Sequence, residues 1–246
     1  MRIAGGRRVS ESAQAQAVTV DIRGRHFRLD GGEKLHVVDT LNFSLPPKSF
    51  TCITGPSGCG KTSTLRMILG LDNQYQGEIH LPEGGPVAAV FQEPRLLPWR
   101  TVEQNVRLVL PESRQNESID ELLVELGLGE MHNFYPNQLS LGLARRAALA
   151  RAFVLQPQLL VLDEPFVSLD EATAERLRNV LMRLWQAQPT TALMVTHNVE
   201  EAVRLADRIL VFSDRPARIA RAIDIEIPRA ERQGRVLQEL IGRVQG

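Results

Sequence analysis

Residues 55–62, Gly-Pro-Ser-Gly-Cys-Gly-Lys-Thr, combine glycines, one amine and one hydroxyl in the spacing G-x-x-x-x-G-K-[ST]. Glycines let backbone amides approach phosphate oxygens closely, and a helix N-terminus adds a partial positive charge. In that arrangement Lys61 reaches the β- and γ-phosphates of a nucleotide, and the hydroxyl of Thr62 holds Mg²⁺. The segment predicts a phosphate-binding cradle; the alternative is an ordinary glycine-rich turn.

Such a cradle needs a strand before it and a helix after it. Residues 49–54 are typical of a short buried strand, and residues 61–69 have a helical pattern.

A second apolar run, 159–162, ends in Asp163 and Glu164. Because parallel strands bring their carboxyl ends to one edge of a sheet, both carboxylates are expected at the phosphate site. We expect Asp163 to bind the Mg²⁺ shell through water and Glu164 to act as general base, typically worth about 10²–10⁴-fold in rate. Alone, the pair would indicate only a solvated strand end.

The composition is that of an ordinary globular protein of 246 residues with 29 basic and 29 acidic side chains. A formal net charge of zero gives no indication of a nucleic-acid partner. The two cysteines, Cys52 and Cys59, are poorly placed for a disulfide, and we expect both to be small buried side chains in a reduced compartment. The arginines near the N-terminus precede no apolar core, so neither a signal peptide nor an anchor is expected.

The remaining pattern is antiparallel at first, then helical, then alternating. Strands are expected over 18–22, 35–38, 41–45, 77–81, 87–91, 191–195 and 208–212, and helices over 102–110, 141–155, 171–186, 199–205 and 231–244, with a capping box at 118–121 opening a further helix that Gly127 ends. The alternation of strands and helices after residue 158 implies a mostly parallel sheet covered on both faces. Phe27 lies among the early strands, where it either stacks on adenine or packs in the core.

From about Val18 to Phe212 the chain resembles the nucleotide-binding subunit of ATP-binding-cassette transporters. Four further segments carry this resemblance: Gln92 after a strand, Leu139-Ser140-Leu141-Gly142-Leu143 before an Ala- and Arg-rich helix, Ser168-Leu169-Asp170, and His197 in Val-Thr-His-Asn. In the family these match the glutamine loop, the signature, the dimer-contact loop and the switch histidine. Taken singly, each would be a surface residue, a satisfied turn or a helix cap. Their occurrence in the family order indicates the family.

The resemblance implies an α/β fold of the P-loop NTPase class, with a mostly parallel central sheet, an antiparallel β subdomain at the N-terminus and an inserted α-helical subdomain. The implied organisation is a disordered tail over 1–17, an ATP-binding core over 18–93 and 154–214, a helical signature subdomain over 94–153, and a short C-terminal extension over 215–246 to which we assign only packing. The implied catalytic residues are Glu164, His197, Lys61 and Gln92, and the metal-binding residues are Thr62, Gln92 and Asp163. The implied ATP-binding residues are Phe27, Gly55, Pro56, Ser57, Gly58, Cys59, Gly60, Lys61, Thr62, Ser63, Ser140, Gly142 and Asp170.

The signature departs from the family pattern at two positions. Leu141 stands where the family usually has glycine, and Leu143 stands where it has glutamine. In related cassettes the serine and a glycine amide grip the γ-phosphate bound on the opposite subunit. A Cβ at Leu141 could crowd that approach, so a weakly hydrolysing or asymmetric cassette is an alternative to a fully active one.

The loop 91–100 resembles the corresponding loop of bacterial importers of nitrate, alkanesulfonates, taurine and related anions. In those systems it receives a short helix of the membrane permease. Two leucines and Trp99 between prolines make a plausible apolar socket for a helix, although Trp99 alone could equally fill a seam between subdomains.

The resemblance therefore implies a transport-coupled ATPase on the cytoplasmic face of the bacterial inner membrane, binding ATP and Mg²⁺. The expected partners are a second cassette, identical or different, two permease subunits and, indirectly, a solute-binding protein, with no nucleic acid. Another hypothesis is a non-transport ATPase acting in DNA repair or on ribosomes. The single cassette, neutral charge and lack of a heptad run argue against it. An exporter or lipid-transport cassette also remains open, and the loop 91–100 argues modestly against it.

Overall fold

The computed structural model describes residues 17–28, 32–81 and 85–246, so the tail expected over 1–17 lies outside the described residues except at its last position. The strands are β1 (Val18–Ile22), β2 (Arg25–Arg28), β3 (Lys34–Leu45), β4 (Phe50–Thr54), β5 (Gly77–His80), β6 (Val87–Val90), β7 (Leu159–Asp163), β8 (Thr191–Val195), β9 (Arg208–Phe212) and β10 (Ala217–Asp224). The α-helices are α1 (Lys61–Ile68), α2 (Val102–Arg107), α3 (Asp120–Glu125), α4 (Leu141–Phe153), α5 (Glu171–Ala187), α6 (Val199–Leu205) and α7 (Gly234–Gln245).

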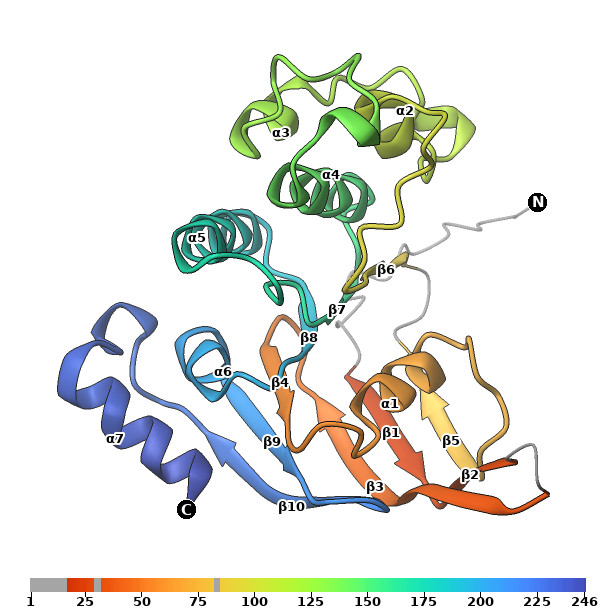
Figure 1. Cartoon of the computed structure of the whole chain (residues 1–246), viewed down its shortest axis with the longest axis vertical. Helices are drawn as coiled ribbons and strands as arrows, with labels where there is room; N and C mark the ends of the chain where they lie inside the picture. Colours follow the sequence, from red (N-terminus) through yellow and green to blue (C-terminus); the bar gives the residue numbers. More distant parts are fainter. Residues whose placement is uncertain (1–16, 29–31, 82–84) are drawn as a thin grey trace, which may run out of the picture.

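The strands of the described residues form one mixed sheet in the order β5-β1-β3-β10-β9-β4-β8-β7-β6, with β2 paired to β3. Strands β6, β7, β8, β4 and β9 are parallel neighbours, whereas β1, β2, β3 and β5 pair antiparallel. Figure 1 shows this sheet across the lower part of the molecule, with α2, α3 and α4 standing together beyond β6 and β7. The expected α/β fold, with its parallel sheet, antiparallel N-terminal strands and inserted helices, is confirmed.

The central strands are mostly apolar because helices cover both faces of a parallel sheet. Every residue of β4, β7 and β8 is buried. Two predicted strands, 35–38 and 41–45, are instead one continuous strand, β3. It pairs with β2 along its first half and with β1 along its second, so a change of partner takes the place of the expected break.

Two of the inserted helices, α2 and α4, begin with side-chain caps. Thr101 accepts a hydrogen bond from Gln104 N and completes a capping box at α2, and Ser140 accepts one from Leu143 N at the start of α4. The capping box predicted at 118–121 is wrong. Ser118 Oγ instead bonds the side chain of Asp120, and α3 begins without a side-chain cap.

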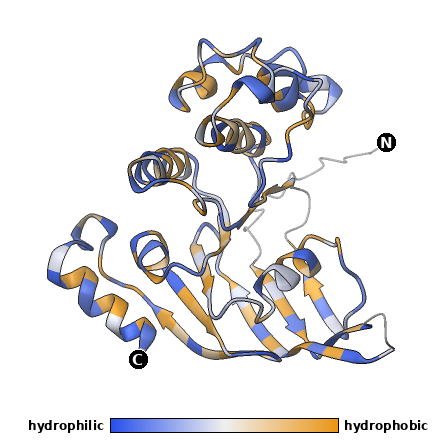
Figure 2. Cartoon of the chain, viewed as in Figure 1, coloured by the Kyte–Doolittle hydropathy of each residue, from blue (hydrophilic) through white to orange (hydrophobic). Residues whose placement is uncertain are grey.

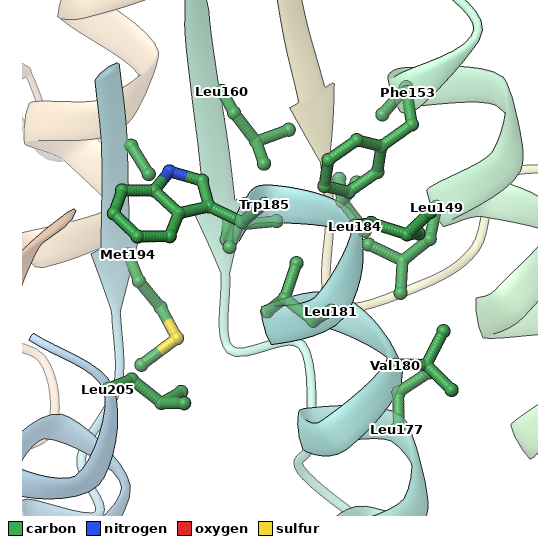
Figure 3. Close-up of a cluster of buried hydrophobic side chains, with 14 of the residues drawn as sticks. Leu149, Phe153, Leu160, Leu177, Val180, Leu181, Leu184, Trp185, Met194 and Leu205 are labelled. Atoms are coloured by element: carbon green, nitrogen blue, oxygen red, sulfur yellow. The ribbon is translucent and has the colours of Figure 1, made fainter. Parts of the chain in front are cut away.

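A hydrophobic core joins the helices to the sheet. Figure 3 shows side chains of α5, including Leu181, Leu184 and Trp185, between Leu160 of β7, Met194 of β8 and the α4 residues Leu149 and Phe153. The indole of Trp185 donates to Thr190 O at 2.8 Å, which satisfies its polar atom in this core. Helix α5 thereby fixes the segment just before it, which contains Glu164 and Asp170, relative to the sheet.

The chain after residue 216 contributes a strand that the sequence pattern did not predict. Strand β10 inserts between β3 and β9, antiparallel to β9. Helix α7 follows it, and Figure 2 shows that α7 alternates hydrophobic and hydrophilic residues. Its buried residues Leu237, Leu240 and Val244 belong to the same core as α6. Among the described residues, no helix combines the length and apolar character required to cross a bilayer.

Candidate functional site

The cradle joins β4 to α1 at the carboxyl end of the parallel strands. Lys61 is the first residue of α1, and its Nζ donates to the carbonyl oxygens of Gly55 and Pro56, both at 2.8 Å. Gly60, which precedes α1, has a φ of 121°, and a Cβ there would lie 3.2 Å from Val37 O. Glycine is therefore required for the chain to turn into the helix so close to β3.

The cradle forms one wall of a cavity of about 550 Å³. Phe27, Arg28, Leu35 and Val37 come to it from β2 and β3, Ser57, Gly58, Gly60, Lys61, Thr62 and Ser63 from the cradle and α1, Glu164 from the end of β7, and Arg215 from the segment after β9. Three side chains in this lining are cations and one is a carboxylate. A cavity with that charge, glycine amides and a helix N-terminus suits a polyphosphate.

The side-chain oxygens of Thr62 and Asp163 lie next to each other beside this cavity. Thr62 Oγ1 and Asp163 Oδ1 lie 3.2 Å apart, although 101 residues separate them in the chain. Burial raises the pKa of Asp163 above its usual value, and the hydrogen bond from Thr62 partly opposes the rise. A hydroxyl beside a carboxylate is a donor set that Mg²⁺ accepts, usually with water and phosphate oxygens completing its shell. The residues present therefore fit the expected ion.

Glu164 and His197 face each other across the ends of β7 and β8. Nδ1 of His197 lies 2.6 Å from Oε2 of Glu164, and His197 is the more exposed of the two. The backbone of Glu164 is held by a hydrogen bond from its N–H to Val195 O at 2.9 Å, and its φ is +46°. A left-handed conformation is uncommon for a glutamate and turns the side chain out of the strand direction. Glu164 thereby lines both the cradle cavity and a second cavity of about 180 Å³, which His197 also lines.

A buried network behind His197 was not predicted from the sequence. Thr196 Oγ1 donates to Glu201 Oε2 at 2.7 Å, and the same Thr196 oxygen accepts from Asn198 N at 3.0 Å. Asn198 in turn caps α6 through Glu200 N and Glu201 N. These bonds fix the chain on both sides of His197. The Thr-His-Asn triplet and the Glu four residues after His197 were the available signal.

Phe27 is supported from one side by an ion pair. The guanidinium of Arg25 lies 3.9 Å from the centroid of the Phe27 ring, and its Nε is 2.8 Å from Asp72 Oδ2. Arg25 and Asp72 are both almost fully buried, whereas Phe27 is half-buried and faces the cradle cavity. Both interpretations of Phe27 made from the sequence thus have a physical basis, because one face is packed and the ring also lines the cavity.

Four predicted site residues lie outside the cradle, its cavity and the adjoining contacts of Asp163 and His197. Gln92 is exposed, and its carbonyl oxygen accepts a hydrogen bond of 3.4 Å from Arg145 of α4. Ser140 and Gly142 lie at the start of α4, and Asp170 caps α5 by accepting from Thr173 N at 2.9 Å. None of these four is among the residues that line the cradle cavity in the described chain.

Arg145 was also missed by the sequence interpretation. It is 4% exposed, and its Nε and Nη1 have no hydrogen-bond partner among the described residues. Burial lowers the pKa of this guanidinium. The neighbouring loop is held more firmly by Arg151, which donates to Pro94 O at 2.9 Å and Arg95 O at 2.8 Å. Helix α4 therefore carries the arginines that anchor the loop containing Gln92.

Both cysteines are free and buried, as expected. Cys59 lies within the cradle with 2% of its surface exposed. Burial raises the pKa of its thiol, and the ammonium of Lys61 opposes part of that rise.

Comparison with known proteins places this geometry in a family. The family model described as ABC transporter matches residues 38–167. The aliphatic sulfonates import ATP-binding protein SsuB of Bacillus subtilis is 37% identical over 220 residues, covering 86% of each chain. The protein of that name from Granulibacter bethesdensis is 44% identical over 198 residues, covering 80% of this chain and 82% of that protein.

A solved structure has the same fold. It is a dimeric ATP-binding cassette in a post-hydrolysis state bound to ADP and Pi, 26% identical, with a TM-score of 0.74 over 86% of this chain and all of that one. The cradle, the carboxylates Asp163 and Glu164, and His197 thus lie in a chain whose sequence matches this family and whose fold matches a solved cassette, and the chain belongs to the ABC transporter family.

Proposed function

We propose that this chain is the ATP-hydrolysing subunit of a bacterial importer for small anions of the sulfonate, taurine or nitrate kind. The sulfonate import ATP-binding proteins cover most of this chain at 37% and 44% identity. The observation on which the chemistry depends is the placement of Glu164 between the phosphate cradle and His197. ATP is the substrate, and the solute itself never touches this chain.

In the proposed site the cradle amides, Lys61 and Ser63 bind the phosphates, and Phe27 supports the adenine. Thr62 and Asp163 would hold Mg²⁺, which when bound neutralises charge on the phosphates. Glu164 orients and deprotonates the attacking water, and the 2.6 Å contact fixes its carboxylate through His197. Gln92 is exposed and lies outside the cradle cavity. Its proposed role therefore requires its loop to move toward the bound phosphates.

The signature residues act on a second cassette in this proposal. Ser140 and the Gly142 amide stand at the N-terminus of α4, where a helix binds anions well. They lie outside the cavity of their own chain, which supports action across a dimer interface, together with Asp170 at the adjacent start of α5. The second cassette is a further copy of this chain or a different one.

We further propose that the dimer sits as a peripheral assembly on the cytoplasmic face of the inner membrane, bound to two permease subunits. Trp99 supports this because its side chain is 70% exposed in a loop between prolines. Trp99 has the largest exposed fraction of the exposed large hydrophobic side chains in the described residues, and aromatic residues are enriched at protein–protein interfaces. A solute-binding protein would deliver the anion to the permease from the other side.

Two measurements test the proposal. Purified chain should bind ATP and release phosphate in the presence of Mg²⁺, and Lys61→Ala should lose binding. In the native host, replacement of Glu164 by Gln should abolish uptake of labelled alkanesulfonate, taurine or nitrate, and the affected anion identifies the solute. A chain that shows no nucleotide affinity would contradict the whole proposal. Normal uptake of all three anions in cells whose Glu164→Gln variant no longer releases phosphate would contradict only the transported class.

A further inference from the structure

Arg215 contacts the phosphate cradle although 157 residues separate it from the cradle residue that it touches. Its Nε and Nη2 both donate to Gly58 O, at 3.1 and 2.5 Å. It is the third residue after β9, in a segment for which the sequence predicted only packing. The sheet order explains the proximity, because β9 is the immediate neighbour of β4, the strand that leads into the cradle.

The Arg215 contact fixes one peptide of the cradle. Gly58 has a φ of 73°, and a Cβ at this position would lie 3.1 Å from Nη2 of Arg215. Only glycine adopts that conformation readily and leaves room for the guanidinium. Arg215 holds the carbonyl of the peptide between Gly58 and Cys59. In a trans peptide the carbonyl and the N–H point in opposite directions, so this contact also fixes the direction of the Cys59 N–H.

The same guanidinium faces the cavity that the nucleotide would occupy. Arg215 lines this cavity together with Lys61 and Phe27, and its side chain is exposed. Among the described residues, neither a hydrogen bond nor an ion pair is found for its Nη1. An arginine fork that places two N–H groups on a carbonyl and keeps another free beside a phosphate cradle is arranged to bind a phosphate oxygen.

We propose that Arg215 is a further nucleotide-binding residue, which holds the cradle through Gly58 and contributes a second positive charge to the bound phosphates. The ammonium of Lys61, the cation of the cradle itself, donates to the Gly55 and Pro56 carbonyls. Arg215 is not part of any motif that predicts phosphate binding, since it comes from the far end of the chain. This inference rests on the proposed ATP binding and adds one residue to it.

The test separates the charge of Arg215 from its hydrogen bond to Gly58. In R215Q the amide can still donate to a carbonyl but carries no charge, whereas R215K keeps the charge and loses the fork. Because charge-assisted bonds to phosphate are stronger than neutral ones, R215Q should bind ATP about tenfold more weakly than wild type, and R215K should bind more tightly than R215Q. The loss in R215Q should shrink at high salt, because an exposed charge is screened.

Arg218 provides the matched control. It lies on β10, pairs with Asp39 and does not line the cavity. R218Q should bind ATP as wild type does. Without nucleotide, the melting temperatures of R215Q, R215K and R218Q should differ little from that of wild type. Equal ATP affinities for R215K and R215Q, whether both normal or both weakened, would overturn the charge role. Wild-type protein that binds no ATP would instead refute the proposed function, so the two failures are distinguishable.

Discussion

Oε2 of Glu164 and Nδ1 of His197 lie 2.6 Å apart at the ends of β7 and β8, with the carboxylate between the phosphate cradle and the imidazole. The backbone bond from Glu164 N to Val195 O holds the strand ends at the correct spacing. A base that is oriented on one side by a histidine and open on the other toward phosphate is arranged to accept a proton from water.

Glu164→Gln should therefore leave ATP binding intact and stop turnover. The amide fills the same volume but accepts no proton, so the rate constant for phosphate release should fall by about 10²–10⁴-fold. Equilibrium titration with ATP and a phosphate-release assay measure the two properties. Glu175→Gln, an exposed carboxylate on α5, is the matched control and should retain the wild-type rate. Full hydrolysis by the Glu164→Gln variant would refute the assignment of the base.

Leu141→Gly should raise the ATPase rate of the dimeric enzyme. Leu141 is the first residue of α4, and 43% of its surface is exposed beside the signature serine, where the partner's phosphate is expected. Removal of its side chain gives that phosphate closer access to the Gly142 amide, at a cost in stability of about 0.5–1 kcal/mol. Leu108 is exposed to the same extent at the end of α2, and Leu108→Gly should leave the rate unchanged. Equal rates for wild type and Leu141→Gly would show that the leucine does not hinder hydrolysis.

Trp99→Ala should weaken binding to the permease and leave the isolated subunit intact. Because its indole is 70% exposed, its loss should change the free energy of unfolding by less than about 0.5 kcal/mol. Trp185 provides the contrast, since it is 6% exposed and packs edge-on against Phe50, and its truncation should cost about 3–5 kcal/mol. Urea unfolding and co-purification with the permease subunits check both statements. Undiminished permease binding by Trp99→Ala would place the docking surface elsewhere.

Alkylation of Cys59 should be slow at pH 7 and should continue to accelerate with rising pH above the ordinary cysteine pKa of about 8.5. The sign follows from the raised pKa, because at any given pH a smaller fraction of the thiol is the reactive thiolate. ATP should slow labelling further, since nucleotide would cover the cradle. Cys59→Ser should label negligibly in the folded state, because the remaining thiol, Cys52, is fully buried in β4. Identical labelling rates with and without ATP would argue against the nucleotide pocket.

The local sequence pattern by itself determined the phosphate cradle and the central strands of this protein. The spacing of Gly55, Gly60, Lys61 and Thr62 specifies a strand, a tight turn and a helix, because only glycine allows that backbone course and only an amine and a hydroxyl complete the chemistry. The apolar runs that became β4, β7 and β8 were equally readable, since a strand buried on both faces requires continuous hydrophobic residues. These elements and the family order of motifs were sufficient to predict the fold class.

Contacts between distant segments were decided only by the tertiary structure. Nothing in the local sequence of Arg215 indicates that it binds the carbonyl of Gly58, because the contact depends on β9 lying beside β4. The contact between Glu164 and His197, across the ends of β7 and β8, and the ion pair beneath Phe27 have the same origin. A side chain's local pattern fixes its element and its face, whereas its partners depend on which strands become neighbours, and strand order is a property of the whole sheet.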